Sequence, residues 1–309
     1  MTQSSAGPVR YRVRHQTDYR YSSNVAVCQN QLRMQPISRG SLTCHWSDLE
    51  ITPPPTSWEQ HTDYFGNQVH TFSIEQAHRS LLVCVESEVS VAPCSVSETV
   101  SSAAWELITS ANSKPQPLLD EYRFASPRIP TASHFADYAR ISLLPGRGIV
   151  DAVFDLTRRI RDEFKYDATA TNVDTTTDQA LKLKAGVCQD FAHVQIACLR
   201  SMGLAARYVS GYLRTVPPEG GERLVGADES HAWLEVFVGS AIGWLGFDPT
   251  NGCLAGTDHI PICLGRDYDD VSPMRGVVLG GGKNTLKVSV DVEEVTQSSS
   301  PKEQSPTGR

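Results

Sequence analysis

The period at which apolar residues recur changes along this chain, and that change restricts the folds it can adopt. Between residues 9 and 95, apolar and polar positions alternate, as in VRYRVRHQTDYRYS and SLLVCVESEVSVAP. This alternation predicts β-strands. Turn-forming stretches separate the strands, and one contains three consecutive prolines, which cannot lie in a central strand. We therefore expect an antiparallel sheet or sandwich in this region.

A helical period takes over further along the chain. GIVDAVFDLTRRIRDEFK, at 148 to 165, predicts an amphipathic helix, and TTTDQALKLKAG predicts a shorter one that ends at Gly186. The run from 187 to 202 predicts a third helix. Helices followed by antiparallel strands, without regular βαβ alternation, indicate an α+β fold. The strands are expected at about 205 to 214, 231 to 239 and 243 to 248.

These patterns divide the chain into four segments. We expect an N-terminal β-rich domain at 9–95, a helical connector at 97–144 and a second domain at 145–292. The end of the second domain, NTLKVSVDVEE, alternates clearly and is expected to join one of the two sheets. Residues 293–309 are polar and rich in proline and serine, which predicts a disordered tail.

The composition argues against several classes of protein. The 309 residues carry a formal net charge of −7, which argues against nucleic acid or an anionic membrane as the main partner. No apolar run is long enough for a membrane helix. The first residues lack the apolar segment of a secretory signal, so we expect a cytoplasmic protein. The oligomeric state is not indicated.

Eight cysteines occur, and one of them stands apart from the rest. No CxxC pair or Cys/His cluster has zinc spacing, so neither a metal site nor a cofactor is expected. Cys198 continues the apolar stripe of its helix and fits a core residue. Cys188 instead follows Gly186 and Val187 in the first helical turn, where unpaired N–H groups and the helix dipole stabilise a thiolate. By itself this position fits a structural cysteine as well as a nucleophile.

Two later motifs supply partners for this cysteine. SHAWLEVFV, from 230, alternates like a strand and begins with His231, which fits a base for Cys188. GWLGFDPTN follows, and Asp248 ends its short apolar strand before a proline. If the two strands pair, the Asp248 carboxylate reaches His231 and fixes its tautomer. Cysteine, histidine and aspartate at a helix start and two strand ends together form a pattern typical of a catalytic triad.

The three motifs resemble those of bacterial proteins of the transglutaminase-like superfamily, a papain-like group of cysteine acyl-transfer enzymes. YRVRHQTDYRYS and DYFGNQVHTFSIE resemble the N-terminal β-rich region of this subgroup, and HIPICLGRDYDDVSPMRG its C-terminal stretch. The resemblance implies a papain-like α+β core in which the helix bearing the cysteine packs on an antiparallel sheet, preceded by a β-rich domain. It also implies that Cys188 is the nucleophile, His231 the base and acid, and Asp248 the orienting carboxylate.

Other residues near the motifs have less specific roles. Tyr166 is expected either to stabilise an oxyanion or line the acyl pocket, or else to pack under the loop that leads to Cys188. Gln189 follows the nucleophile and is a candidate pocket residue, and Asp190 is expected to brace the helix start. Trp233 is interpreted as a wall of the site or a core residue. The acidic stretch GRDYDD lacks an EF-hand pattern and fits a solvated turn better than a calcium site.

The implied chemistry is acyl transfer through a thioester, with a peptide or protein substrate. A peptidase or amidase would release the acyl group to water, whereas a transglutaminase would pass it to an amine held in a water-poor tunnel, which Trp233 and Trp244 could wall. A non-catalytic binding module of the same fold is a third reading, which the intact triad disfavours. We favour hydrolysis, because crosslinking in the cytoplasm would be hazardous.

Overall fold

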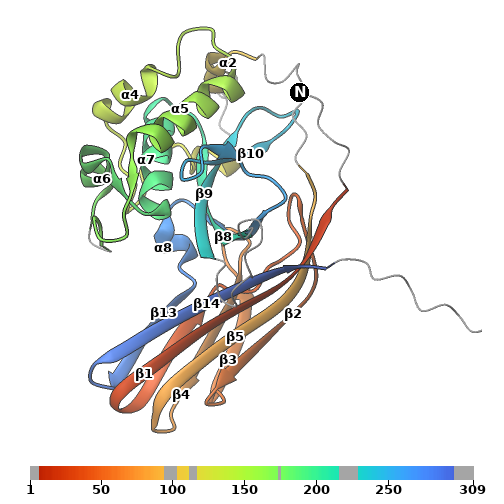
Figure 1. The fold of residues 1–309 in the computed structure, drawn as a ribbon, viewed down its shortest axis with the longest axis vertical. Helices are drawn as coiled ribbons and strands as arrows, with labels where there is room; N and C mark the ends of the chain where they lie inside the picture. Colours follow the sequence, from red (N-terminus) through yellow and green to blue (C-terminus); the bar gives the residue numbers. More distant parts are fainter. Residues whose placement is uncertain (1–6, 94–102, 111–116, 173–174, 216–228, 296–309) are drawn as a thin grey trace, which may run out of the picture.

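The computed structural model describes residues 7–93, 103–110, 117–172, 175–215 and 229–295. It has two parts, a long twisted sheet and a mixed helical and β part above it (Figure 1). Among the described residues, no helix is both long and apolar enough to cross a membrane. Of the predicted tail at 293–309, residues 296–309 lie outside the described part, and strand β14 continues to Glu294.

The first sheet is built around one very long strand, β1, in which apolar and polar residues alternate. Its first half pairs with β5 and its last residues pair with β4, so β1 links two groups of strands. Tyr11 and Val13 alternate with exposed arginines, as expected for a strand with one buried face. The strands of this sheet from the N-terminal region are β1 (Val9–Leu32), β2 (Leu42–Thr52), β3 (Ser57–Thr62), β4 (Gln68–Ile74) and β5 (His78–Val91).

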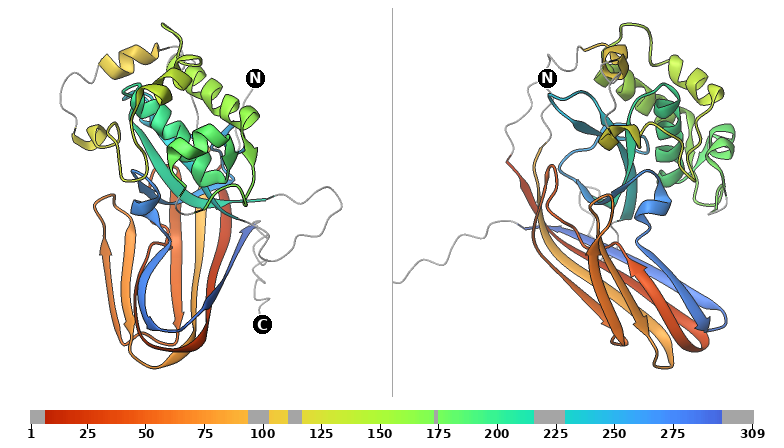
Figure 2. Two further views of the ribbon diagram at one scale, coloured as in Figure 1. Left: turned by 90° about the vertical axis from the view of Figure 1, so that its left-hand side faces the viewer. Right: turned by 180° about the vertical axis from the view of Figure 1, so that it is seen from behind.

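Two strands from the end of the chain complete this sheet. β13 (Met274–Gly280) and β14 (Asn284–Glu294) both pair antiparallel with β1 (Figure 2). The C-terminal strand, which the sequence predicted to join one of the two sheets, therefore joins the sheet of the N-terminal region. Alternation fixes which side chains of a strand share a face, but it does not specify the partner strand.

The second part places helices against a five-stranded antiparallel sheet of order β11-β10-β9-β8-β12. The helices gather on one side of its central strands (Figures 1 and 2). Its longer elements are α4 (Ser133–Arg140), α5 (Ile149–Glu163), α6 (Thr177–Leu183), α7 (Cys188–Ser201), β8 (Ala206–Leu213), β9 (Glu229–Phe237), β10 (Trp244–Asp248) and β12 (His259–Gly265). The shorter ones are α2 (Trp105–Ser110), α3 (Pro117–Asp120), β6 (Lys165–Tyr166), β7 (Ala185–Gly186), β11 (Cys253–Leu254) and α8 (Tyr268–Val271).

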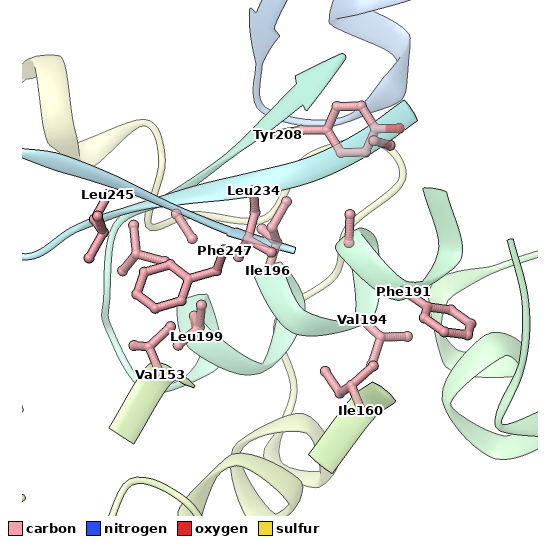
Figure 3. Packing of buried hydrophobic residues seen from close by; sticks show 14 of the residues in the cluster. Val153, Ile160, Phe191, Val194, Ile196, Leu199, Tyr208, Leu234, Leu245 and Phe247 are labelled. Carbon is pink, nitrogen blue, oxygen red and sulfur yellow. The ribbon is translucent and has the colours of Figure 1, made fainter. Parts of the chain in front are cut away.

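Helix α7 is the centre of the second part. From Asp190 to Arg200 it is buried on all sides between the sheet and the other helices, and its buried polar side chains are hydrogen-bonded, as Gln195 is to Thr157 and Arg200 is to backbone carbonyl oxygens. Ile196 points toward Leu234 of β9 and Phe247 of β10, and Val194 points toward Ile160 of α5 (Figure 3). This packing holds the N-terminal end of α7 at the end of the sheet.

Helix α6 ends earlier than the sequence predicts. Thr176 caps its start by accepting the Gln179 N–H, while the Gln179 side chain accepts the Thr176 N–H. The helix stops at Leu183, because Lys184 adopts a left-handed conformation with φ of 47°. The prediction that Gly186 ends the helix is wrong, since Gly186 lies in β7 and pairs with Tyr166 of β6.

The two parts share one hydrophobic core. Tyr11, Val13, Val290 and Val292 of the first sheet belong to the same buried cluster as α5, α7 and β9. A separate cluster fills the far end of the first sheet. Specific polar contacts cross the same boundary, among them the Asn67 amide, which donates to the Leu264 carbonyl oxygen over 2.8 Å. The N-terminal sheet is thus joined directly to the part that carries the candidate triad.

Candidate active site

Cys188 lies in the first turn of α7, as the sequence predicts. Its side chain is partly exposed and lines a cleft, whereas Cys198, ten residues later, is fully buried. The first N–H groups of a helix have no partner within the helix, and they carry the positive end of its dipole. Cys188 therefore combines access from solvent with a position at the positive end of the helix dipole.

A carboxylate braces the turn that leads into this helix. Asp190 is buried, and its Oδ2 atom accepts the Val187 N–H over 2.9 Å and the Thr171 hydroxyl over 2.7 Å. The Asp190 side chain lies directly against Gly186, where a Cβ atom would overlap it. Asp190 therefore has the bracing position expected from the sequence, and Gly186 is required by this close approach.

His231 connects the cysteine to the carboxylate of Asp248. Its Nε2 atom lies 2.8 Å from Asp248 Oδ2, and its ring lines the same cleft as the Cys188 side chain, which acts on its pKa. Because Nε2 faces Asp248, Nδ1 is the ring nitrogen left for the cysteine. His231 of β9 and Asp248 of β10 reach each other because these two strands pair antiparallel, with Phe247 opposite Leu234. The structure thus brings Cys188, His231 and Asp248 together in the order inferred from the sequence.

Asp248 has more partners than the sequence indicates. Its side chain is fully buried and accepts hydrogen bonds from the backbone N–H groups of Thr250 and Asn251 and from the Asn251 amide. His259 of β12 also contacts it, with Nε2 3.0 Å from Asp248 Oδ2. The Gly256 N–H donates to the other His259 nitrogen, so the proton is on Nε2 and His259 donates to Asp248.

The sequence analysis missed His259, because no motif distinguishes it. It begins the edge strand β12, which pairs with β8 and not with β10. Only the folded sheet brings it beside Asp248. The signal that was available is weak, namely a histidine at the start of an apolar strand eleven residues after the aspartate.

Charge is strongly stabilised in this cluster. Burial alone would disfavour protonation of His231, but hydrogen bonds and charges from Asp248 and Cys188 raise the pKa of His231 to about 10. Burial likewise opposes ionisation of Asp248, yet hydrogen bonds from His231 and His259 hold the pKa of its carboxyl well below the ordinary value. At neutral pH, His231 is therefore an imidazolium paired with the Asp248 carboxylate.

The other candidate residues have different positions. Gln189 lines the cleft beside Cys188. Tyr166 is half exposed in β6, its ring lies edge-on to Phe191 with centroids 6.3 Å apart, and it does not line the cleft. This position fits the packing alternative for Tyr166 better than the pocket alternative.

Trp233 is a buried packing residue next to the triad. Its ring stacks near the His231 ring, with centroids 6.0 Å apart. The indole extends over Gly211 of β8, where a Cβ atom would collide with it and with the Ile260 carbonyl oxygen. Trp233 does not line the cleft beside Cys188, so its position fits the core alternative better than a wall of the site.

Three side chains of the cluster have a geometry that could accept a metal ion. The ligand atoms of His231, Asp248 and His259 all lie within 4.8 Å of one another. Both histidine nitrogens already point at one carboxylate oxygen at hydrogen-bonding distance, so the cluster is satisfied by its own protons. The acidic residues of the GRDYDD stretch are also engaged, since Arg128 binds Asp269 and Arg266 binds Asp270.

Comparisons with known proteins give this geometry a family. Residues 11–90 match the bacterial transglutaminase-like N-terminal region, and residues 142–249 match the transglutaminase-like superfamily. The chain belongs to the transglutaminase-like superfamily. An uncharacterized protein of Mycobacterium tuberculosis (strain H37Rv) is 38% identical over 294 residues, which is 93% of each chain. One of Mycobacterium leprae is 33% identical over 292 residues, covering 92% of this chain and 98% of the relative.

A solved structure agrees with this assignment. A proposed cysteine protease from Cytophaga hutchinsonii superimposes with a TM-score of 0.75, covering 96% of this chain and 94% of that one, at 18% identity. At that identity the likeness concerns the fold alone. The predicted fold of this transglutaminase-like chain is confirmed: a papain-like α+β core, in which the helix bearing the cysteine packs on an antiparallel sheet, preceded by a β-rich region.

Proposed function

We propose that this chain is a cysteine peptidase or amidase that acts through a thioester on peptide or carboxamide bonds. The observation that carries the proposal is that Cys188 and His231 line one cleft and that His231 is hydrogen-bonded to the buried Asp248. A partly exposed thiol beside an imidazolium is the arrangement that nucleophilic catalysis by cysteine needs. A binding module without catalysis would not require it.

The first half of the reaction forms the acyl-enzyme. The Cys188 thiolate attacks the carbonyl carbon, so a C–S bond forms while the carbonyl oxygen takes up negative charge. N–H groups in the first turn of α7 are suited to stabilise that oxyanion. The C–N bond then breaks, and the proton of the His231 imidazolium goes to the departing nitrogen. Asp248 keeps the imidazole oriented throughout.

Water completes the cycle in a hydrolase. Neutral His231 takes a proton from the water that attacks the thioester carbon, the C–S bond breaks, and the acid product leaves. The thiolate and imidazolium are thereby restored, and no external reactant is consumed except water.

One observation favours hydrolysis over transfer to an amine. Trp233 and Trp244, the suggested walls of an amine tunnel, line a second pocket of about 680 Å³ on the sheet. Within the described residues, neither Cys188 nor His231 lines that pocket. An acceptor amine held there would not face the thioester. The cytoplasmic location, a peptide or protein substrate and the absence of nucleic-acid or membrane partners stay predictions.

A mixture of glutamine-containing peptides, offered with and without a labelled primary amine, tests the proposal. We expect ammonia or cleaved peptide to appear without incorporation of the label. Cys188→Ala is the matched control and should abolish turnover while the protein stays folded, as judged by circular dichroism. Label incorporation would establish a transferase instead, and equal turnover by Cys188→Ala would contradict the thioester mechanism.

A further inference from the structure

The cleft beside Cys188 is walled in part by the N-terminal sheet. Its volume is about 380 Å³, and it lies between the start of α7, strands β8 and β9, and strands β1 and β14. The wall from the first sheet consists of paired positions, with Thr17 of β1 opposite Val288 of β14 and Tyr19 opposite Leu286. Because alternate residues of a strand share a face, one face of this two-strand ribbon is turned toward the nucleophile.

The two faces of this ribbon differ in charge. On the face away from the cleft, Asp18 lies opposite Lys287 in the strand register, and Arg14 lies opposite Asp291. Among the described residues that line the cleft, there is no aspartate, glutamate, lysine or arginine. The charge pattern thus separates a solvated face from a face suited to an apolar ligand.

Away from Cys188 and His231, the polar groups that β1 and β8 contribute to the cleft wall are neutral. His15 lies in the wall, buried, with Nδ1 2.8 Å from the Tyr212 hydroxyl and Nε2 3.2 Å from the Thr17 hydroxyl. Burial lowers the pKa of His15 to about 4, so the ring is uncharged at neutral pH. Burial also raises the pKa of Tyr208, another wall residue, which keeps its hydroxyl protonated.

Apolar side chains in this wall are left open to solvent. Leu286 is 53% exposed and Val288 is 47% exposed. Met274 and Tyr19 contribute further partly exposed apolar surface. Exposed apolar surface grouped around a cleft marks a place where an apolar group is bound. A cavity of this size, at the lower end of the range for ligand pockets, accommodates one large side chain with its flanking backbone.

We propose that this cleft is a specificity subsite for a large, uncharged apolar side chain next to the scissile bond, and that strands β1 and β14 form its wall. The inference rests on the proposed function, because it assumes that Cys188 attacks the carbonyl group adjoining that side chain. The preferred acyl donors are therefore peptides in which phenylalanine, leucine or methionine adjoins the cleaved bond. Donors with aspartate or lysine there are rejected, since their charge would be buried without a partner.

The first arm of the test measures kcat/KM for peptide amides that differ only in the residue beside the cleaved bond. We expect phenylalanine and leucine to exceed aspartate and lysine by about tenfold or more. Val288→Asp should remove most of this preference. Thr285→Asp is the matched control, because it adds the same charge to β14 on the opposite face, beside Arg20, and should leave the preference intact.

The second arm does not depend on turnover. It compares the rates at which iodoacetamide and N-phenyliodoacetamide modify Cys188, identified by peptide mapping. The quantity compared is the rate with N-phenyliodoacetamide divided by the rate with iodoacetamide. We expect this ratio to be several-fold higher for Cys188 than for a free thiol in solution. Val288→Asp and Leu286→Asp should lower this ratio, and Thr285→Asp should not. Two wall variants are used, so that one that misfolds, as seen by circular dichroism, leaves the other to decide.

The two arms separate the subsite from the proposed function. A ratio in the wild-type protein no higher than that of a free thiol, or one that the wall variants leave unchanged, would overturn the subsite. Peptide turnover with no preference between leucine and lysine would overturn it as well. Absence of turnover with every peptide, combined with a raised phenyl ratio that the wall variants lower, would contradict the proposed function and still support the subsite.

Discussion

At the scale of single residues, the surroundings of the thiols set their reactivity. Cys188 is partly exposed beside His231, whereas burial raises the pKa of Cys198 and raises that of Cys253 to about 11. We therefore expect iodoacetamide to modify Cys188 first near neutral pH, because the thiolate is the reactive form. Peptide mapping after partial alkylation measures the order. Faster modification of Cys198 or Cys253 in the folded protein would remove the basis for the nucleophile assignment; Cys94 lies outside the described residues.

His259 offers a second test at this scale, because it donates to the same Asp248 oxygen that His231 contacts. His259→Phe removes that donor and should lower kcat/KM by about tenfold, roughly the value of one hydrogen bond to a charged group. The acid limb of the pH–rate profile should also move to higher pH, because Asp248 becomes easier to protonate without this donor. His259→Gln, which can donate again, should restore most of both effects. If the pH profile of His259→Phe is unchanged, His259 contributes packing only and does not tune Asp248.

The pKa of His231 predicts how stability depends on pH. Its folded value of about 10 lies above the ordinary 6.5, despite the opposing effect of burial, because Asp248 and Cys188 favour the charged ring. The stabilisation by protonated His231 is therefore complete below about pH 6.5 and is lost as the pH rises toward about 10. We expect the difference in free energy of unfolding between wild type and His231→Gln to shrink across that interval, as measured by urea denaturation.

His15 provides the control of opposite sign. Burial lowers its pKa to about 4, so its neutral folded form costs stability only as the pH falls below about 6.5. The difference between wild type and His15→Gln should therefore stay constant between about pH 6.5 and about pH 10. A His231→Gln difference equally constant in that range would contradict the ion pair with Asp248.

At the scale of elements, the start of α7 depends on one close approach. A Cβ atom at Gly186 would overlap the Asp190 carboxylate that accepts the Val187 N–H. Gly186→Ala should destabilise the protein by about 1 to 3 kcal/mol, as overpacking does, and displace Cys188 enough to lower activity. Gly256→Ala is the control, because open space surrounds that position. Thermal melts and peptide turnover measure both variants, and wild-type behaviour of Gly186→Ala would refute this account of the turn.

At the scale of the whole molecule, the two parts are expected to unfold together. β13 and β14 return from the second part to pair with β1, and a single buried cluster spans both parts. Proteolytic cleavage within the predicted connector at 97–144 should therefore leave two fragments that elute as one species. Native gel filtration after limited proteolysis measures this. Separation of the fragments without denaturant would mean that the shared core contributes little.

The sequence by itself determined the type of most elements and the three positions of the candidate triad. Strand alternation and helical spacing are local properties, so they identified β1, α5 and α7 without knowledge of the fold. The position of Cys188 at a helix start followed from the same local pattern. The exact end of α6 could not be predicted in this way. Lys184 ends the helix in a left-handed conformation, which is uncommon for lysine.

Tertiary structure alone decided which distant segments meet. The last strand alternates clearly, yet only long-range pairing, such as that of Tyr11 with Glu294, assigns it to the first sheet. The same pairing places Val288 in the wall of the cleft beside Cys188, and the path of β12 brings His259 to Asp248. Periodicity records which side of an element is buried. It carries no record of what buries it, because that depends on contacts between residues far apart in the chain.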